Sequence, residues 1–331
     1  MYVNPVIAST WSFGEPANAA AWPILIDAHR EDASLSAVEA ACRHADLNPE
    51  VDSVGYGGLP DAHGQMSLDG AVMLGPFHFG GVCGLRRHLH PASVGRLVME
   101  RTEHGLLCGE DADVFADKHN VPEAEILSPE AYETWKSWNE RRDDYSADKQ
   151  GALRVRPLDG GPGTGKLFGH DTIGVLALDS EGVLAAACST SGLAFKVPGR
   201  VGDSPIVGHG LYVLPGIGAV TATGTGELIS GTCVSFVAVE AMRNGATPFE
   251  AVASSLDRVD NLEGLESHHQ VALVAMDSNG TVASGALRGG FRAAIHDEQG
   301  GRVVDPDLVV RPDDEPLPEK ARDGMSQGED T

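Results

Sequence analysis

Positive charge is scarce in this chain of 331 residues. Lysine and arginine together number 24 against 48 aspartates and glutamates, which gives a formal net charge of −24. Such a chain repels polyanions, so we expect no nucleic acid and no anionic membrane surface as a partner. The acidic balance suits a salt-adapted protein and an ordinary acidic protein equally well, and both interpretations stay open. The six lysines are at positions 118, 136, 149, 166, 196 and 320.

Cysteine motifs and long apolar runs are missing as well. The five cysteines are scattered without a CxxC pair, so neither a disulfide framework nor a zinc ribbon is indicated. We expect most of them to be buried small side chains. No histidine stands at a metal-binding spacing from carboxylates or cysteines, so we expect no metal and no cofactor. Residues 1–8 lack the basic region and the apolar run of a signal peptide or membrane anchor, which favours a cytoplasmic enzyme.

Aromatic residues make up only 5% of the chain, whereas 42% of it is hydrophobic and 41 residues are glycine. Glycines recur in the apolar runs 55–58 and 80–84, which predicts tight strand-to-helix turns and close approach of backbones. This composition fits a single large α/β domain better than a helical bundle.

Hydrophobic periodicity predicts the order of the secondary structure. Strands are expected at 6–9, 68–74, 106–108, 172–179, 183–189, 210–214, 218–222, 270–276 and 281–287. Helices are expected at 17–28, 34–44, 92–103, 129–142, 227–244 and 248–258. Residues 143–169 are polar and glycine-rich without sustained periodicity, so we interpret them as an exposed linker. The charged, proline-containing tail at 312–331 is expected to be disordered.

The most informative segment is Gly-His-Asp-Thr-Ile-Gly at 169–174, which places a hydroxyl nucleophile directly after an aspartate. A cut between Asp171 and Thr172 would give Thr172 a free amine beside its own hydroxyl. The unperturbed pKa of an α-amino group is about 7.7 to 8.0, so part of it is uncharged near neutral pH and accepts a proton. One residue would then supply both nucleophile and base, a variant of the usual hydrolase arrangement.

A second segment, Gly-Gly-Pro-Gly-Thr-Gly-Lys-Leu at 160–167, satisfies the GxxxxGK pattern of a phosphate-binding loop. Such a loop requires serine or threonine after the lysine, with a strand before it and a helix behind it. Here Leu167 follows the lysine, and the next regular element is a strand-like run. The pattern therefore favours a flexible linker, with a non-catalytic P-loop or ligand-binding protein as the alternative from another class.

Three further features of the sequence have both a structural and a functional interpretation. Arg200 and Asp203 stand three residues apart in a loop of glycines and prolines. On the pattern alone a surface salt bridge is the simpler interpretation, although a guanidinium and an aspartate together also recognise the carboxylate and ammonium of an amino acid. The turn at 221–227 would cap a helix or hold an oxyanion. Trp11 is either a core aromatic or a pocket wall.

Taken together, these residues resemble the glycosylasparaginases, which are N-terminal nucleophile hydrolases that cleave N4-(β-N-acetylglucosaminyl)-L-asparagine. The resemblance follows the family's order over most of residues 1–300. It is carried by STW at 9–11, SVGYGGLP at 53–60, LRR at 85–87, HDTIG at 170–174, GRVGDSP at 199–205 and TGTG at 223–226.

The resemblance implies a four-layer αββα sandwich and a precursor that cuts itself. The α chain would be residues 1–171 and the β chain residues 172–331, both within one domain, and the αβ units would form a homo-oligomer. The cut would involve His170, Asp171 and Thr172: the Thr172 hydroxyl attacks the Asp171 carbonyl, an ester forms by N-to-O acyl shift, and water resolves it. In turnover Thr172 would attack the substrate's side-chain amide, forming a β-aspartyl enzyme and releasing the glycosylamine.

The resemblance also implies roles for residues around the nucleophile. Thr190 would hydrogen-bond to the nucleophile, and Thr223 with Gly224 would form the oxyanion hole. Arg200 would bind the substrate α-carboxylate and Asp203 its α-amine, which favours the amino-acid clamp over the surface salt bridge. The walls of this pocket would include Gly226 and Trp11.

Residues 143–169 and the acidic tail show no match to the family. The nearest alternative is the plant-type L-asparaginase and β-aspartyl (isoaspartyl) peptidase, whose nucleophile usually follows a glycine. The pair His170-Asp171 and the segment at 10–13 favour the glycosylasparaginase branch instead.

Overall fold

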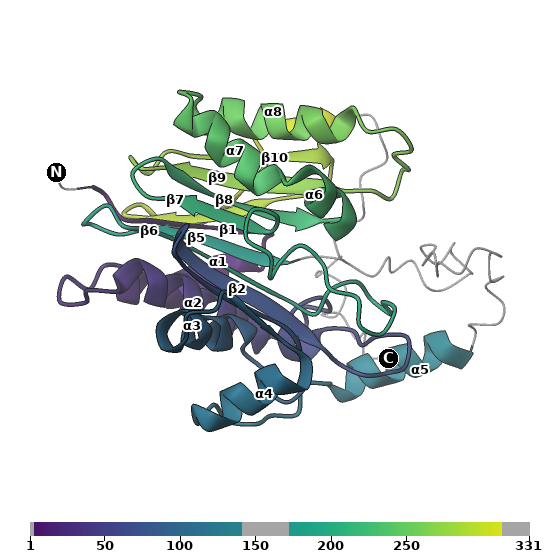
Figure 1. The fold of residues 1–331 in the computed structure, drawn as a ribbon. Coiled ribbons are helices and arrows are strands. Elements are labelled where there is room, and N and C mark those ends of the chain that lie inside the picture. Colours follow the sequence, from purple (N-terminus) through teal and green to yellow (C-terminus); the bar gives the residue numbers. More distant parts are fainter. Residues whose placement is uncertain (1–2, 141–171, 313–331) are drawn as a thin grey trace, which may run out of the picture.

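The structure, a computed structural model, describes residues 3–140 and 172–312 (Figure 1). The expected linker at 143–169, the P-loop-like run at 160–167, the cleavage residues His170 and Asp171, and residues 313–331 of the acidic tail lie outside the described residues.

Two β-sheets run through the described part of the chain. The larger has eight strands in the order β12-β11-β1-β5-β6-β2-β3-β4, and the smaller has five in the order β13-β10-β9-β8-β7. The larger sheet contains β1 (Val6–Thr10), β2 (Leu68–Gly75), β3 (His78–Leu85), β4 (Leu106–Cys108), β5 (Ile173–Leu178), β6 (Leu184–Thr190), β11 (Ala293–Asp297) and β12 (Gly300–Val304). The smaller contains β7 (Leu211–Leu214), β8 (Gly218–Gly224), β9 (Val271–Asp277), β10 (Val282–Arg288) and β13 (Leu308–Arg311).

Strands from both described segments alternate within the larger sheet. The hairpin of β5 and β6 is inserted between β1 and β2, with β5 antiparallel to β1 and β6 antiparallel to β2. Every residue of these two inserted strands is buried, because both faces of the sheet are covered at this point. The two segments therefore share one core.

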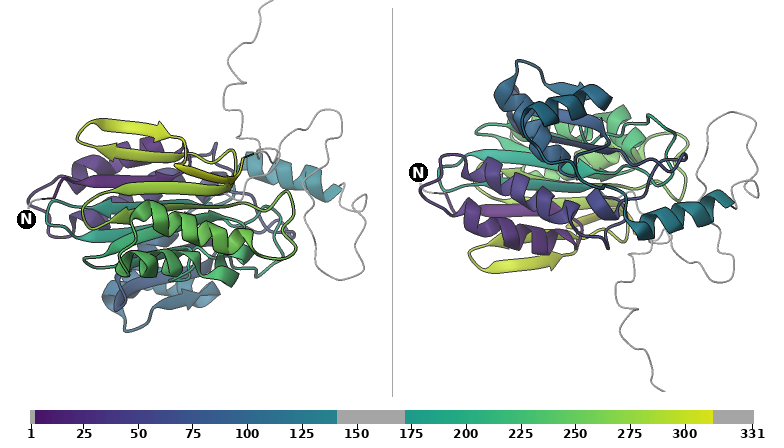
Figure 2. Two further views of the ribbon diagram at one scale, coloured as in Figure 1. Left: turned by 90° about the horizontal axis from the view of Figure 1, so that it is seen from above. Right: turned by 90° about the horizontal axis from the view of Figure 1, so that it is seen from below.

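Helices cover the outer faces of the two sheets (Figures 1 and 2). The larger sheet is covered by α1 (Gly14–Leu25) and α2 (Ala33–Asp46), and the smaller by α7 (Val234–Arg243) and α8 (Pro248–Asp260). The remaining helices are α3 (Pro91–Arg101), α4 (Gly109–Lys118), α5 (Pro129–Glu140), α6 (Gly226–Thr232) and the 3-10 turn η1 (Gly55–Gly57). A mixed α/β architecture with two sheets confirms the expected fold class at this level.

The two sheets approach each other closely at the start of β5. A Cβ atom at Gly174 would collide with Oγ1 of Thr221 on β8. Only glycine leaves room for this approach. The start of β5, directly after Thr172, therefore lies against the end of β8, which contains Thr223.

The glycines at 80–84 were expected in a turn, and this was wrong. They lie within strand β3, which pairs with β2 and β4. A Cβ atom at Gly80 would collide with the carbonyl oxygen of Gly95 on α3. The expected close approach of backbones is confirmed at Gly80, because the absence of a side chain lets helix α3 pack directly on strand β3.

The single helix expected at 227–244 is two helices. Cys233, between α6 and α7, has a left-handed backbone with φ of 52°, which interrupts the helical hydrogen bonds. Strands β3 and β11 to β13 and helix α4 had no prediction. Strands β11, β12 and β13 contain only four or five residues each, which is too short for a clear alternation of polar and apolar side chains. Of the five cysteines, Cys42, Cys83 and Cys188 are buried, as expected for most of them.

Candidate active site

Thr172, the predicted nucleophile, is buried directly before β5, with 4% of its surface exposed. Its carbonyl oxygen accepts a hydrogen bond of 2.6 Å from Oγ1 of Thr10, at the end of β1. The same Oγ1 accepts a hydrogen bond of 2.9 Å from the backbone nitrogen of Gly174. Strand β1 thus fixes the backbone of the nucleophile through one hydroxyl group.

The nitrogen and the hydroxyl of Thr172 both face other hydroxyl groups. The nitrogen donates to Oγ1 of Thr223 at 2.9 Å, and Oγ1 of Thr172 lies 3.0 Å from Oγ of Ser204. Thr223 Oγ1 also accepts a hydrogen bond of 2.9 Å from Nε1 of Trp11. Because Thr223 Oγ1 accepts from two N–H groups, its own proton remains to be donated to another acceptor.

Trp11 fits both of its interpretations. It is 9% exposed and its ring packs edge-on against Phe291, with ring centroids 5.2 Å apart. Its indole nitrogen reaches the hydroxyl of Thr223 in the site. The backbone has φ of 63°, a strained value for a bulky side chain and one found at functional sites. The ring therefore belongs to the core, and its polar edge belongs to the site.

Thr190 has different hydrogen-bond partners from those expected. Its hydroxyl donates to the carbonyl oxygen of Ser53 at 3.2 Å and accepts from the nitrogen of Gly192 at 2.9 Å. The hydroxyl partner of Thr172 within the described chain is Ser204. In this arrangement Thr190 fixes the turn after β6, and a direct contact with the nucleophile stays a prediction.

Gly224 ends β8 with φ of 122°, in a region that only glycine adopts readily. A Cβ atom there would collide with the carbonyl oxygen of Gln270 on the neighbouring chain segment. The position beside Thr223 is therefore restricted to glycine by backbone geometry. Its proposed part in an oxyanion hole stays a prediction.

Arg200, Asp203 and Gly226 meet at one point. A Cβ atom at Gly226 would lie 2.8 Å from Nη2 of Arg200 and 2.8 Å from Oδ1 of Asp203. The Arg200 side chain is 15% exposed, and its guanidinium binds Glu227 with both Nε, at 2.9 Å, and Nη2, at 3.0 Å. The positive and negative groups expected for an amino-acid clamp are thus adjacent, and Gly226 leaves the space beside them.

Asp203 is 4% exposed, and its Oδ2 atom has no hydrogen-bond partner in the described part of the chain. Burial raises the pKa of this carboxyl to about 7, with Glu227 and Asp69 also raising it and Arg200 lowering it. A buried carboxylate oxygen without a partner is costly unless a cation binds to it. The next residue, Ser204, contacts the nucleophile, so the clamp residue Asp203 is adjacent in sequence to a residue that contacts Thr172.

Known proteins of similar sequence identify the family of this chain. The sequence matches the family described as asparaginase over residues 15–304. The chain belongs to the asparaginase family. Among curated relatives, N(4)-(Beta-N-acetylglucosaminyl)-L-asparaginase of Elizabethkingia miricola is 35% identical over 312 residues, which is 93% of this chain and 86% of the relative. The mouse N(4)-(beta-N-acetylglucosaminyl)-L-asparaginase is 32% identical over 270 residues, which is 77% of both chains.

Two residues of this asparaginase-family chain contact the nucleophile without having been assigned a role. Thr10 and Ser204 lie within quoted motifs, STW and GRVGDSP. Short polar side chains such as these are as typical of turns as of active sites, so the residue type alone did not indicate a site role. The only signal in the sequence was their position within the two motifs. Structure was needed because their contacts with Thr172 span 162 and 32 residues of sequence.

A buried ion pair beside the clamp was also missed. Lys196 is 3% exposed; its Nζ donates to the carbonyl oxygens of Ser191, at 2.9 Å, and Ser67, at 3.3 Å, and lies 4.0 Å from Oδ2 of Asp69. Burial lowers the pKa of Lys196 and raises that of Asp69. The ring of Trp138 stacks on that of Phe195, with centroids 4.4 Å apart, and this contact ties α5 to the same loop.

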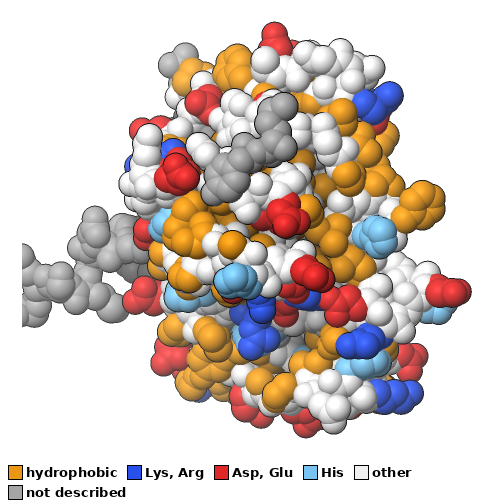
Figure 3. All heavy atoms as spheres, turned by 90° about the vertical axis from the view of Figure 1, so that its left-hand side faces the viewer, with side chains coloured by type: hydrophobic (Ala, Val, Ile, Leu, Met, Phe, Trp, Pro, Cys, Tyr) orange, Lys and Arg blue, Asp and Glu red, His pale blue; other side chains and the backbone are white. Residues whose placement is uncertain are grey.

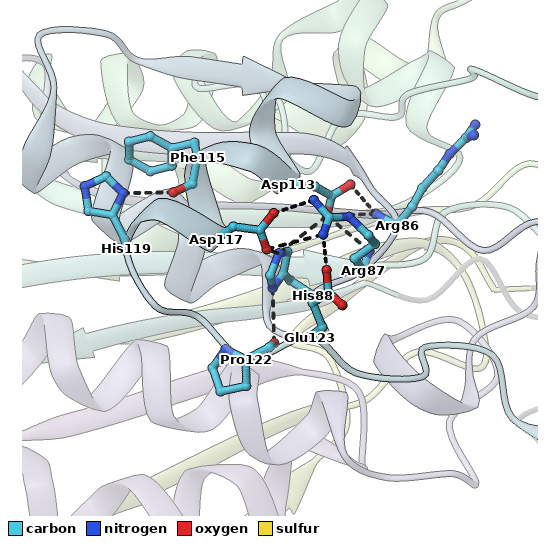
Figure 4. A network of polar contacts seen from close by, with 9 residues as sticks. All are labelled: Arg86, Arg87, His88, Asp113, Phe115, Asp117, His119, Pro122 and Glu123. Atoms are coloured by element: carbon cyan, nitrogen blue, oxygen red, sulfur yellow. Dashed lines mark hydrogen bonds and ion pairs between the residues drawn. The ribbon is translucent and has the colours of Figure 1, made fainter.

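A second polar network contains none of the predicted site residues (Figure 4). The buried His88 has Nδ1 3.1 Å from the carbonyl oxygen of Pro122 and Nε2 3.2 Å from Oδ1 of Asp117. Arg87 binds both Asp117 and Glu123. These contacts join the end of β3 to α4. They border a depression of about 650 Å³ whose lining contains none of the predicted site residues: Gln65, Met66, Arg86, Arg87 and residues 123–127.

Clusters of metal-binding side chains and membrane-spanning helices are both absent among the described residues. Among the described residues no group of three or more histidine, cysteine or acidic side chains is placed to hold a metal ion. In the same residues no helix has the length and apolar character needed to cross a membrane. On the face shown in Figure 3, acidic side chains are spread between hydrophobic and basic ones instead of forming one patch.

Proposed function

We propose that this chain is an autoprocessing amidohydrolase that cleaves the side-chain amide of N4-(β-N-acetylglucosaminyl)-L-asparagine. The relatives named for this activity are 32% to 35% identical to it. The observation that carries the proposal is the adjacency of clamp and nucleophile: Asp203 is a buried carboxylate beside Arg200, and the next residue, Ser204, lies 3.0 Å from the hydroxyl of Thr172. An amino acid held at the clamp would present its side-chain amide to that hydroxyl.

In turnover, the free amine of Thr172 takes the proton from its own hydroxyl, and Oγ1 attacks the amide carbon. The negative oxygen formed in this step is stabilised by the Thr223 hydroxyl and the Gly224 N–H. The protonated amine then gives its proton to the leaving nitrogen, which departs as the glycosylamine. Water, deprotonated by the same amine, hydrolyses the β-aspartyl ester and releases aspartate and the threonine hydroxyl.

The proton needed for the oxyanion hole is available at Thr223. Its Oγ1 already accepts from Trp11 Nε1 and from the nitrogen of Thr172, at 2.9 Å each, so its O–H points to a third partner. This supports Thr223 as a donor to a developing oxyanion instead of a mere helix cap.

The maturation step follows the same chemistry on the chain itself. The Thr172 hydroxyl attacks the carbonyl carbon of Asp171, the peptide nitrogen becomes the free amine, and water hydrolyses the resulting ester. The products are an α chain ending at Asp171 and a β chain beginning at Thr172. The interleaved strands of the larger sheet would keep the two chains together without a disulfide.

We extend the proposal to architecture and assembly. The fold is the four-layer αββα sandwich of the N-terminal nucleophile hydrolases, supported by helices on the outer faces of two stacked sheets (Figure 1). The αβ units form a homo-oligomer, and the enzyme acts in the cytoplasm on a small-molecule substrate. Size-exclusion chromatography with light scattering tests the assembly; a mass equal to one αβ unit would contradict it.

The central experiment compares hydrolysis rates of GlcNAc-asparagine, asparagine and β-aspartyl dipeptides by the purified protein. We expect the first to give the highest kcat/KM, whereas a preference for either of the others would assign the chain to the L-asparaginase or isoaspartyl-peptidase activity. Intact mass measures maturation in parallel. Thr172→Ala is expected to abolish both cleavage and hydrolysis, and retained activity would refute the nucleophile.

A further inference from the structure

The contact between Arg200 and Glu227 uses only one side of the guanidinium. Nε and Nη2 bind the two carboxylate oxygens of Glu227 at 2.9 and 3.0 Å. These two nitrogens form the lateral fork of an arginine. The terminal fork, made of Nη1 and the second proton of Nη2, is directed elsewhere.

Glycines border the terminal fork. A Cβ atom at Gly202 would lie 2.9 Å from Nη1, and one at Gly192 would lie 3.2 Å from Nη1. At Gly226 a Cβ atom would lie 2.8 Å from Nη2 and from Oδ1 of Asp203. Side chains at these positions would crowd the guanidinium end, so glycine keeps it accessible next to the buried carboxylate.

We propose that Glu227 is a positioning residue of the amino-acid clamp: it holds the lateral fork of Arg200 so that the terminal fork faces the α-carboxylate of the substrate. This inference rests on the proposed function and deepens it. In this proposal Glu227 acts through the orientation of Arg200. An arginine held on one fork loses less rotational freedom when the other fork binds, which favours carboxylate binding.

A surface salt bridge is the competing interpretation, and two observations weigh against it. The Arg200 side chain is only 15% exposed, although that of Glu227 is 58% exposed, and the pair is bidentate. Exposed pairs of flexible side chains contribute little, whereas bidentate pairs with a buried arginine fix geometry. The charge of Glu227 also acts on the clamp, since it raises the pKa of Asp203.

The test compares Glu227→Gln with wild type on two substrates: GlcNAc-asparagine and its analogue without the α-carboxylate, the β-alaninamide of the same glycosylamine. On the full substrate we expect KM to rise about tenfold with kcat within about twofold of wild type. On the analogue we expect the variant and wild type to have the same KM, because the terminal fork has no partner there. An unchanged KM on GlcNAc-asparagine, or an equal loss on both substrates, would overturn the inference.

The pH profile gives a readout that a purely structural contact would not change. The charged groups facing Asp203 are Arg200, Glu227 and Asp69, and Lys196 lies beside Asp69. Removing the negative charge of Glu227 lowers the pKa of Asp203, so the acidic limb of kcat/KM should move to lower pH in Glu227→Gln. No shift, or a shift to higher pH, contradicts this.

Glu240→Gln is the matched control, because Glu240 binds Arg243 in an ion pair on α7. It should behave as wild type in every assay. Thermal unfolding reports the folding of each variant, and intact mass reports its self-cleavage. If wild type hydrolyses none of these substrates, the proposed function fails; if wild type is active and Glu227→Gln matches it, only the inference about Glu227 fails.

Discussion

The two halves of the candidate site are built from different chemistry. Around Thr172 the contacts are neutral: the hydroxyls of Thr10, Ser204 and Thr223 and the indole of Trp11. Around Asp203 the contacts are charged, and two carboxyls there, Asp203 and Asp69, have pKa values raised by burial. Neutral groups orient the nucleophile at any moderate pH, whereas the charged groups make substrate binding sensitive to pH. Substitutions in the neutral half should therefore lower kcat, whereas substitutions in the charged half should weaken substrate binding.

The largest effect is expected in the neutral half. Thr223→Ala removes the proposed oxyanion donor and the acceptor of two N–H groups, so kcat should fall about 10²- to 10³-fold. KM should change little, because the clamp is intact. Steady-state kinetics with GlcNAc-asparagine measure both constants. Thr223→Ser is the control that restores the hydroxyl; a Ser variant as inactive as the Ala variant would speak against the donor role.

Asp203→Asn is the corresponding change in the charged half. It keeps the shape but removes the charge that binds the α-ammonium, so kcat/KM should fall about 10²-fold. Self-cleavage should proceed as in wild type, because maturation needs no amino-acid clamp. Intact mass measured against time checks this. A variant that stays uncut would show that the charged half also affects self-cleavage, and the two halves of the site would then not be independent.

The pH dependence follows from the pKa of Asp203. With that pKa near 7, the clamp is charged above neutral pH, and kcat/KM should fall about tenfold per unit below it. The amine of Thr172 titrates in a similar range, with an unperturbed pKa of about 7.7 to 8.0. Profiles of wild type and Asp203→Asn separate the two groups: the limb that survives in the variant belongs to the amine.

The raised pKa also predicts an opposite trend for stability. Between the ordinary aspartate pKa of 3.8 and the raised pKa of about 7, the folded state keeps the proton on Asp203 while the unfolded state has lost it. The contribution of this group to the free energy of unfolding therefore decreases as pH rises through that range. Thermal unfolding should show that Asp203→Asn gains stability over wild type at pH 8 but not at pH 4, and equal differences at both pH values would contradict the assignment.

The smallest effect is expected for Ser204→Ala. The hydroxyl of Ser204 lies 3.0 Å from Oγ1 of Thr172 and orients it, while the amine supplies the base. We expect kcat to fall about five- to tenfold, the effect of one neutral hydrogen bond. Single-turnover kinetics would isolate the chemical step. A loss as large as that of Thr223→Ala would mean that Ser204 takes part in proton transfer.

The sequence predicted the long, strongly periodic elements because burial on both faces makes their apolar runs continuous, as in β5 and β6. The prediction failed where the conformation of a single residue ends a helix. The left-handed backbone of Cys233 separates two helices, although the hydrophobic periodicity continues across it. In the site, the motifs singled out Arg200 and Asp203, and the structure brings the two side chains together beside Gly226. The motifs did not indicate that Ser204 contacts the nucleophile or that Lys196 lies beside the clamp. Both contacts join segments that are distant in sequence, so they are set by the tertiary fold.

The insertion of the β5–β6 hairpin between β1 and β2 has a consequence for how the chain reaches its native state. The first segment on its own leaves a two-strand gap in its sheet, so the sheet closes only when the later segment arrives. Such non-local pairing is slow, and a covalent tether keeps the local concentration of the missing hairpin high. The uncut connection between the two segments would then assist folding of the precursor and would be lost after self-cleavage. Fragments separated after the cut would have to find each other by diffusion, so renaturation of the mature protein should be far less efficient than that of the precursor.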